Sequence, residues 1–272
     1  MRTRQNRPWR TRVGGRSPAN ILIALLVLAI LAVAATKGVQ SGKISWALVI
    51  MAGVAIPSIM FHEVSHGVVA YWCGDDTAKR AGRLSANPVR HIDPIGTIIL
   101  PVVLVLLHGP VFGWAKPVPV SLNRLRHPRN QAVLVGLAGP ASNALVAVLA
   151  GIGMHFVAAG NQELSLRLYY SVGEFTTNFG SGIAYWIGVI LGFLGLVNVI
   201  IGAFNLIPIP PLDGSALLER FIPVSALPLY YRIRMGFLIV VFLFIFLDQG
   251  FLGSVYTHLA TWYLHLSLPL PG

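Results

Sequence analysis

Five apolar runs dominate this chain and limit how it can fold more than any other feature. They cover residues 19–36, 44–72, 131–158, 182–205 and 235–247. A helix needs about 20 mostly apolar residues to cross the hydrocarbon core of a bilayer, and most of these runs come near or exceed that length. Only 11% of the residues are charged, whereas soluble domains carry about a quarter. The sequence therefore predicts an all-α polytopic membrane protein that contacts the lipid bilayer.

A shorter apolar segment, residues 95–107, contains Pro101 and is followed by Gly109 and Pro110. Its length and its proline favour a re-entrant or interfacial segment over a full crossing. With a cytosolic N-terminus and no crossing here, 17 of the 20 Lys and Arg lie on the cytosolic side, and with a crossing only 11 do. The first arrangement follows the positive-inside rule. We expect a bundle of about five to six transmembrane helices, with five crossings plus this re-entrant segment.

The chain, residues 1–272, leaves no room for a separate soluble domain beside such a bundle, so we expect one membrane-embedded domain. Residues 1–18 form a basic tail, expected in the cytosol, which we interpret as a topology signal and not as a nucleic-acid site. Ala32–Ala34 resembles a signal-peptidase site. An uncleaved anchor is favoured because the run 19–36 exceeds the core of about 7–15 residues in a signal peptide.

The second apolar run carries His62, Glu63 and His66. Residues four apart share one face of a helix, so the two imidazoles can bind one metal ion. Zinc accepts imidazole and carboxylate ligands, and a catalytic zinc site keeps a fourth position for water. Cys73 is the only cysteine, which excludes a thiolate cluster within one chain. The pattern predicts one Zn²⁺ ion with Glu63 as the general base, and the alternative is a cluster of interhelical hydrogen bonds.

The third ligand is expected at Asp213, the carboxylate beside the fourth apolar run, where several prolines end that run. Zinc lowers the pKa of a bound water from about 15.7 to about 7, so peptide hydrolysis is the natural reaction. Asn205 and Asn143 are candidates for holding the substrate backbone or a developing oxyanion. Interhelical hydrogen bonding is an equally good interpretation of these two amides.

Prolines recur between Arg80 and Val120, at Pro88, Pro94 and in the run Lys116-Pro117-Val118-Pro119. Proline disfavours helix and biases the residue before it towards extended backbone. We therefore expect short strands near the cytosolic face of the membrane.

Three motifs give the chain a resemblance to a known family. They are His62-Glu63-x-x-His66, Ala138-Gly139-Pro140-Ala141-Ser142-Asn143, and the segment from Asn205 to Gly214 that ends in Leu-Asp-Gly. Together they resemble the site-2 protease family of intramembrane zinc metalloproteases, in its compact form without added regulatory domains. Ser215 departs from the pattern, since many relatives carry a second glycine there.

This resemblance implies a catalytic core, residues 44–214, in which His62, His66 and Asp213 hold one zinc ion. It also implies cleavage of transmembrane protein substrates within or near their spans, as in regulated intramembrane proteolysis. The compact family type indicates a prokaryotic plasma membrane. From the predicted topology we expect a multi-pass cell-membrane protein with a cytosolic N-terminus and its active site toward the cytosol.

The alternative function is a non-proteolytic zinc-binding membrane protein, such as a metal transporter or a membrane chaperone. A transporter is expected to carry several intramembrane acidic or histidine sites, often in repeated halves. The sequence shows neither a repeat nor a second cluster of this kind. It leaves open whether the protein pairs with a copy of itself as a homo-oligomer.

Overall fold

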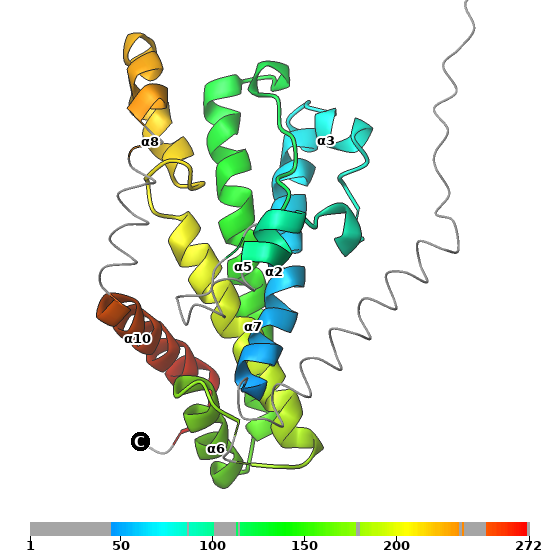
Figure 1. Cartoon of the computed structure of the whole chain (residues 1–272), viewed down its shortest axis with the longest axis vertical. Helices are drawn as coiled ribbons and strands as arrows, with labels where there is room; N and C mark the ends of the chain where they lie inside the picture. The colour runs from blue at the N-terminus through cyan, green and yellow to red at the C-terminus, as the bar shows by residue number, and fades with distance from the viewer. Residues whose placement is uncertain are drawn as a thin grey trace, which may run out of the picture. The chain divides into compact units, whose positions relative to one another are not determined.

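The computed structural model describes residues 45–85, 87–100, 113, 115–177, 180–233, 236 and 249–270. Trp46–Gly272 form one compact unit (Figure 1). The predicted first span, residues 19–36, lies outside the described residues, as does nearly all of the predicted fifth span, 235–247. The same holds for residues 101–107 of the proposed re-entrant segment.

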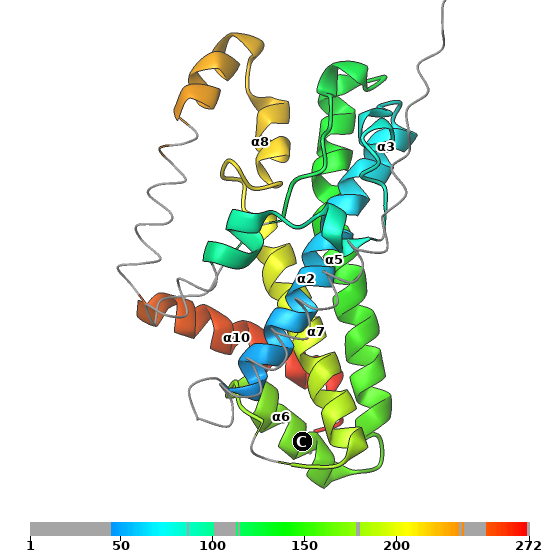
Figure 2. The same cartoon turned by 45° about the vertical axis from the view of Figure 1, so that its right-hand side comes forward.

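Three long helices form the body of this unit: α2, Trp46–Trp72; α5, Pro128–Ala158; and α7, Ile183–Asn205. Among the described residues, these three helices are long and apolar enough to cross a membrane. Each of them packs against the other two, and α5 and α7 share the most extensive contact (Figure 2). The predicted helical runs 44–72, 131–158 and 182–205 are therefore confirmed as helices.

The ends of the three helices follow local sequence signals. Gly74 adopts a φ of 109° just after α2, where a side chain would be strained. Pro128 opens α5 at a position whose N–H needs no intrahelical partner. Prolines at 208, 210 and 211 stop α7 shortly after Asn205. The C-terminal ends of α2 and α7 and the N-terminal end of α5 lie at one end of the bundle (Figure 1).

The connection between α2 and α5 is built from short helical turns. These are α3, Thr77–Arg80; η1, Pro88–Arg90; η2, Pro94–Ile99; and η3, Leu122–Arg124. No strand forms within the part of the chain that the structure describes, in contrast to the strands predicted between Arg80 and Val120. Residues 115–121 form neither helix nor strand: Pro117 and Pro119 lack an N–H and the Val118 N–H is bound to a side chain, which leaves no regular ladder.

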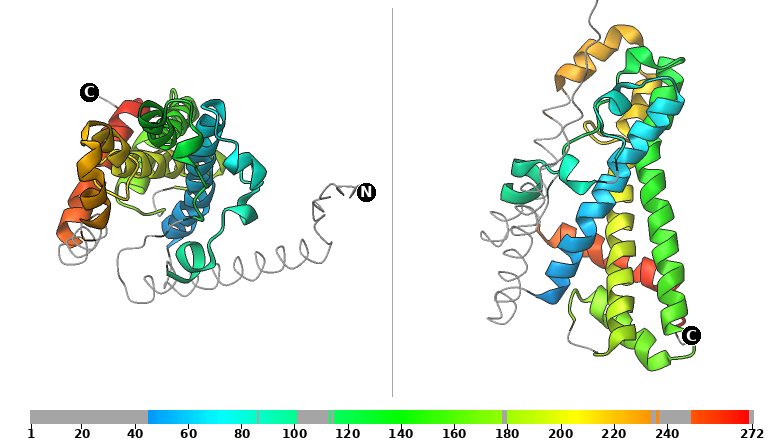
Figure 3. Two further views of the ribbon diagram at one scale, coloured as in Figure 1. Left: turned by 90° about the horizontal axis from the view of Figure 1, so that it is seen from above. Right: turned by 90° about the vertical axis from the view of Figure 1, so that its right-hand side faces the viewer.

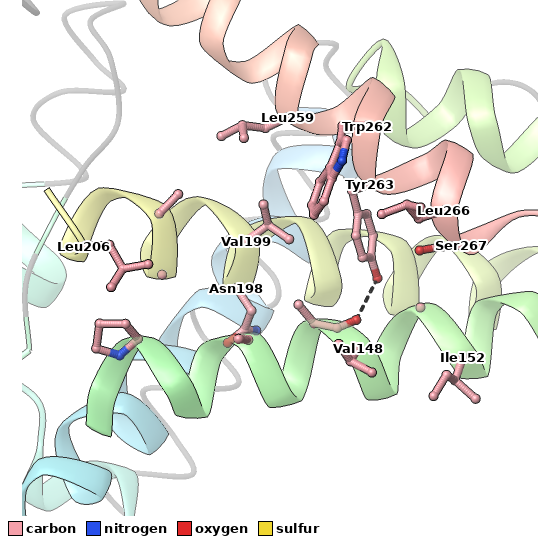
Figure 4. Close-up of a pocket in the computed structure, with 16 residues that line it drawn as sticks. Val148, Ile152, Asn198, Val199, Leu206, Leu259, Trp262, Tyr263, Leu266 and Ser267 are labelled. Atoms are coloured by element: carbon pink, nitrogen blue, oxygen red, sulfur yellow. Dashed lines mark hydrogen bonds between the residues drawn. The ribbon is translucent and has the colours of Figure 1, made fainter. Parts of the chain in front are cut away.

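Three helices were not predicted from the sequence: α6, Gln162–Gly173; α8, Ser215–Phe221; and α10, Gln249–Ser267. Helix α10 is interrupted by polar residues and carries no uniform apolar run. It lies across the bundle and packs against α5, α6 and α7 (Figure 3). A cavity of about 560 Å³ lies between α5, α7 and α10, and at its wall the Tyr263 hydroxyl donates to the Ala147 carbonyl at 3.2 Å (Figure 4).

Candidate metal centre

The structure brings His62, His66 and Asp213 together, and their ligand atoms all lie within 4.8 Å of one another. The two histidines lie one turn apart on α2, and Asp213 follows the proline-rich turn after α7. The Asp213 Oδ2 atom is 2.9 Å from His62 Nε2 and 3.3 Å from His66 Nε2. The two Nε2 atoms are 3.1 Å apart. Residues about 150 positions apart therefore converge on one point, as the sequence led us to expect.

Both imidazoles are buried, and the Nδ1 atom of each contacts an oxygen atom of α5. His66 Nδ1 lies 2.6 Å from the carbonyl oxygen of Val135, and His62 Nδ1 lies 2.5 Å from the side-chain oxygen of Asn143. A carbonyl oxygen only accepts hydrogen bonds, so each Nδ1 carries the ring proton. The Nε2 lone pair of each neutral ring then points at Asp213.

This arrangement fits a metal ion. Two Nε2 lone pairs and the Oδ2 atom of Asp213 face one another, and Oδ2 is buried without a hydrogen-bond partner. Three acceptors with no proton between them repel one another unless a cation lies among them. Two imidazoles and one carboxylate are a donor set typical of catalytic zinc, with a fourth position for water. The described residues contain one such group of potential metal ligands.

Two glycines of α5 make room for this group. A Cβ atom on Gly139 would lie 2.5 Å from both His62 Cε1 and His66 Nε2, closer than real contacts allow. A Cβ atom on Gly136 would lie 3.0 Å from the backbone oxygen of Asp213. The approach of α2 and of the Asp213 turn to α5 therefore requires hydrogen at both positions. The motif that contains Gly139 signalled this region in the sequence, but not the steric reason.

Glu63 is half-buried beside His62, and its Oε2 atom accepts a hydrogen bond of 2.9 Å from the backbone N–H of Val118. Segment 115–121 is fixed on both sides of this contact. Lys116 N–H donates to the His91 carbonyl at 2.8 Å, and Ser121 N–H donates to Asp75 Oδ2 at 2.6 Å. Nothing in the sequence pairs Val118 with Glu63, because they are 55 residues apart.

Asp75 anchors this segment from the end of α2. It is fully buried, and its carboxylate also accepts hydrogen bonds from the hydroxyl and the N–H of Thr77. Burial opposes ionisation, but the hydrogen bonds from Thr77 and Ser121, together with the charge of Arg124, lower the pKa of Asp75 below its usual value. Asp75 is therefore ionised at neutral pH, the form that accepts these hydrogen bonds.

The two predicted amide residues lie close to the ligands. Asn205 donates from Nδ2 to the Ile201 carbonyl at 3.0 Å, and its own carbonyl accepts from Gly214 N–H at 2.7 Å, which closes the turn that carries Asp213. Asn143 is completely buried and bound to His62. The oxyanion role of these two residues stays a prediction, since these contacts are internal to the protein.

Comparisons with known proteins agree with this geometry. The model of peptidase family M50 matches residues 47–247. The candidate zinc metalloprotease YwhC of Bacillus subtilis is 38% identical over 168 residues, which cover 62% of this chain and 67% of YwhC. The candidate zinc metalloprotease Rip2 of Mycolicibacterium smegmatis is 33% identical over 202 residues, or 73% of this chain and 68% of Rip2. No solved structure matches the chain.

Proposed function

The chain belongs to peptidase family M50, the site-2 protease family of membrane metalloproteases, and we propose that it hydrolyses peptide bonds within or near the transmembrane segments of other membrane proteins. In this role it would carry out regulated intramembrane proteolysis with one zinc ion. The observation that carries the proposal is the convergence of His62, His66 and Asp213 beside Glu63. The two histidines and Glu63 lie on α2, which is long enough to span a membrane.

The residues divide the chemistry among themselves. His62, His66 and Asp213 would hold the zinc ion, which when bound supplies the Lewis acidity that makes water a nucleophile at neutral pH. Glu63 takes a proton from the attacking water and delivers it to the leaving amine, the usual work of a general base and acid. The Val118 N–H fixes one oxygen of the Glu63 carboxylate, so the group needs little reorientation before the reaction.

A substrate helix hides its peptide carbonyls in its own hydrogen bonds, so the segment to be cut has to unwind. Residues 115–121, which form no helix, pass Glu63 at Val118, and their backbone groups would guide an extended peptide by strand addition. The ionisable groups His62, Glu63 and His66 on one apolar helix favour the same function, since such groups are costly inside a membrane and usually mark a functional site.

We propose a multi-pass location in the cell membrane, in a prokaryotic plasma membrane, with the N-terminus and the active site toward the cytosol. The distribution of positive charge supports this orientation, because cytosolic ends of spans are rich in Lys and Arg. Apart from Arg167, all described Lys and Arg lie between α2 and α5, in the first turn of α5 or beyond α7: Lys79, Arg80, Arg83, Arg90, Lys116, Arg124, Arg126, Arg129, Arg220 and Arg232. His66 lies six residues before the end of α2 at Trp72, or about 9 Å from this face at 1.5 Å per residue.

Removal of the metal tests the proposal. Treatment of the purified protein with a zinc chelator is expected to abolish cleavage of single-span model substrates in detergent, because the attacking water loses its Lewis acid. Added Zn²⁺ should restore cleavage and Mg²⁺ should not, since imidazole ligands suit zinc far better than magnesium. Cleavage that persists once bound zinc is undetectable by elemental analysis would contradict a zinc mechanism.

Gly67→Ala tests the contact between Val118 and Glu63. A Cβ atom there would lie 2.8 Å from Val118 Cγ1 and 2.7 Å from Leu84 Cδ2, so both side chains must move, and Val118 carries the N–H that binds Glu63. We expect turnover to fall roughly tenfold because Glu63 loses its orientation, while bound zinc stays at the wild-type level. Adding Val118→Ala, which removes one of the two clashing groups, should recover part of the loss. Wild-type turnover in Gly67→Ala would contradict this prediction.

A further inference from the structure

A chain of buried polar groups leads from His62 away from the metal centre and joins all three spanning helices. On α5, Asn143 places Oδ1 2.5 Å from His62 Nδ1 and donates from Nδ2 to Asn198 Oδ1 at 2.6 Å. On α7, Asn198 donates from Nδ2 to Ser58 Oγ of α2 and to the Leu194 carbonyl, both at 2.8 Å. Asn143 and Asn198 are 0% exposed and Ser58 is 3% exposed.

The direction of these hydrogen bonds is set at the far end of the chain. The Leu194 carbonyl can only accept, so the nitrogen of the Asn198 amide, and not its oxygen, has to face it. The Asn198 oxygen then accepts from the Asn143 nitrogen, which leaves the Asn143 oxygen facing His62. His62 Nδ1 must therefore carry the proton, and the lone pair remains on Nε2.

Ser58, which lies on α2 with the two histidines, supports the same direction of hydrogen bonding. Its hydroxyl donates to the Val54 carbonyl at 2.7 Å, so its oxygen is left to accept from Asn198. With both hydrogens of the Asn198 amide engaged, one by Ser58 and one by Leu194, a flipped amide would bring oxygen against oxygen. Such a conflict inside an apolar bundle leaves buried polar groups without partners, which opposes the flipped orientation.

We propose that Asn198 and Ser58, acting through Asn143, are positioning residues that hold His62 in the tautomer whose Nε2 is free to bind zinc. This inference rests on the proposed function, because it takes the metal centre as a zinc site. His66 needs no such relay, since its Nδ1 is bound directly to the Val135 carbonyl. Both histidines are thus held in the same tautomer, but by different groups. A backbone carbonyl holds His66, and side chains from α2, α5 and α7 hold His62.

Replacement of Asn198 tests whether the relay holds the tautomer of His62. Leucine has the branched outline of asparagine but can neither donate nor accept a hydrogen bond, so Asn198→Leu removes the contacts of Asn198 with Asn143, Ser58 and the Leu194 carbonyl together. Tyr185→Phe provides a matched control, because it removes a different buried hydrogen bond between helices, the 2.7 Å contact of Tyr185 with Ser171. Ser58→Ala, which deletes a single hydroxyl, carries the test if Asn198→Leu does not fold.

The experiment measures zinc affinity by competition with a chelator, together with ¹⁵N shifts of labelled histidine in the metal-free protein. For Asn198→Leu we expect zinc binding about 10 to 100 times weaker and loss of a single His62 tautomer. Ser58→Ala should show a smaller change of the same kind, and Tyr185→Phe should match the wild type.

Wild-type affinity and an unchanged tautomer in both Asn198→Leu and Ser58→Ala would overturn the relay. So would an equal loss in Tyr185→Phe, since general loosening of the bundle would then explain the effect. The two proposals fail in different ways. A wild-type protein that binds no zinc refutes the proposed function as well, whereas tight wild-type binding that ignores Asn198 and Ser58 refutes the relay alone.

Discussion

Glu63→Gln is expected to lower the rate of peptide cleavage about 10² to 10⁴-fold while bound zinc stays at the wild-type level. Glutamine has nearly the same shape, and its amide oxygen can still accept the hydrogen bond from Val118 N–H. It cannot take a proton from water at neutral pH. The change therefore removes the general base and leaves the metal ligands and the backbone in place.

The measurement is turnover of a single-span substrate by both proteins, with zinc counted in the same samples. Glu163→Gln is a matched control, because Glu163 pairs with Arg167 on α6, a helix that supplies none of the metal ligands, and this variant should cleave normally. If Glu63→Gln lost its zinc, Glu63 would act as a ligand and not as the base. A zinc-binding protein that is not a protease would show no cleavage in either form.

Gly139→Ala is expected to weaken zinc binding by at least about 100-fold, the largest effect we foresee for adding a single methyl group. The new Cβ atom would lie within 2.6 Å of the Nε2 atoms of both His62 and His66. The rings can move aside only by straining or breaking their hydrogen bonds to Val135 and Asn143. One or both imidazoles must therefore turn away from Asp213.

Zinc content by elemental analysis, alongside thermal unfolding, checks this expectation. Gly153→Ala is the matched control on the same helix, because its Cβ atom would meet only the end of the Leu191 side chain, at 3.2 Å. It should retain zinc. Full zinc occupancy in Gly139→Ala would mean that the metal does not lie between these two histidines.

The sequence was sufficient to predict the three described spans and the candidate metal ligands. Each span is an apolar run of the right length, and His62 and His66 stand at the spacing that puts two imidazoles on one helix face. Asp213 was found because it is the carboxylate next to the run that ends at Asn205. These are local signals, and each can be recognised without the rest of the fold.

The features that were missed depend on contacts between distant segments. The contact of Val118 with Glu63 and the partnership of Asn198 with Asn143 join residues 55 positions apart. Helix α10 has no continuous apolar run, and its burial comes from packing on α5, α6 and α7. The strands expected from the prolines do not form in the described residues, because proline favours extended backbone but removes the N–H that a ladder needs.

The most direct test of the central claim is to map the cut by mass spectrometry. The purified protein is placed in liposomes with a single-span substrate, and the products of the wild type and of Glu63→Gln are compared. We predict that the wild type cuts within or next to the apolar segment of the substrate and that Glu63→Gln does not. Cuts confined to the soluble tails, or the same cuts by both proteins at equal rates, would contradict an intramembrane protease that uses Glu63 and zinc.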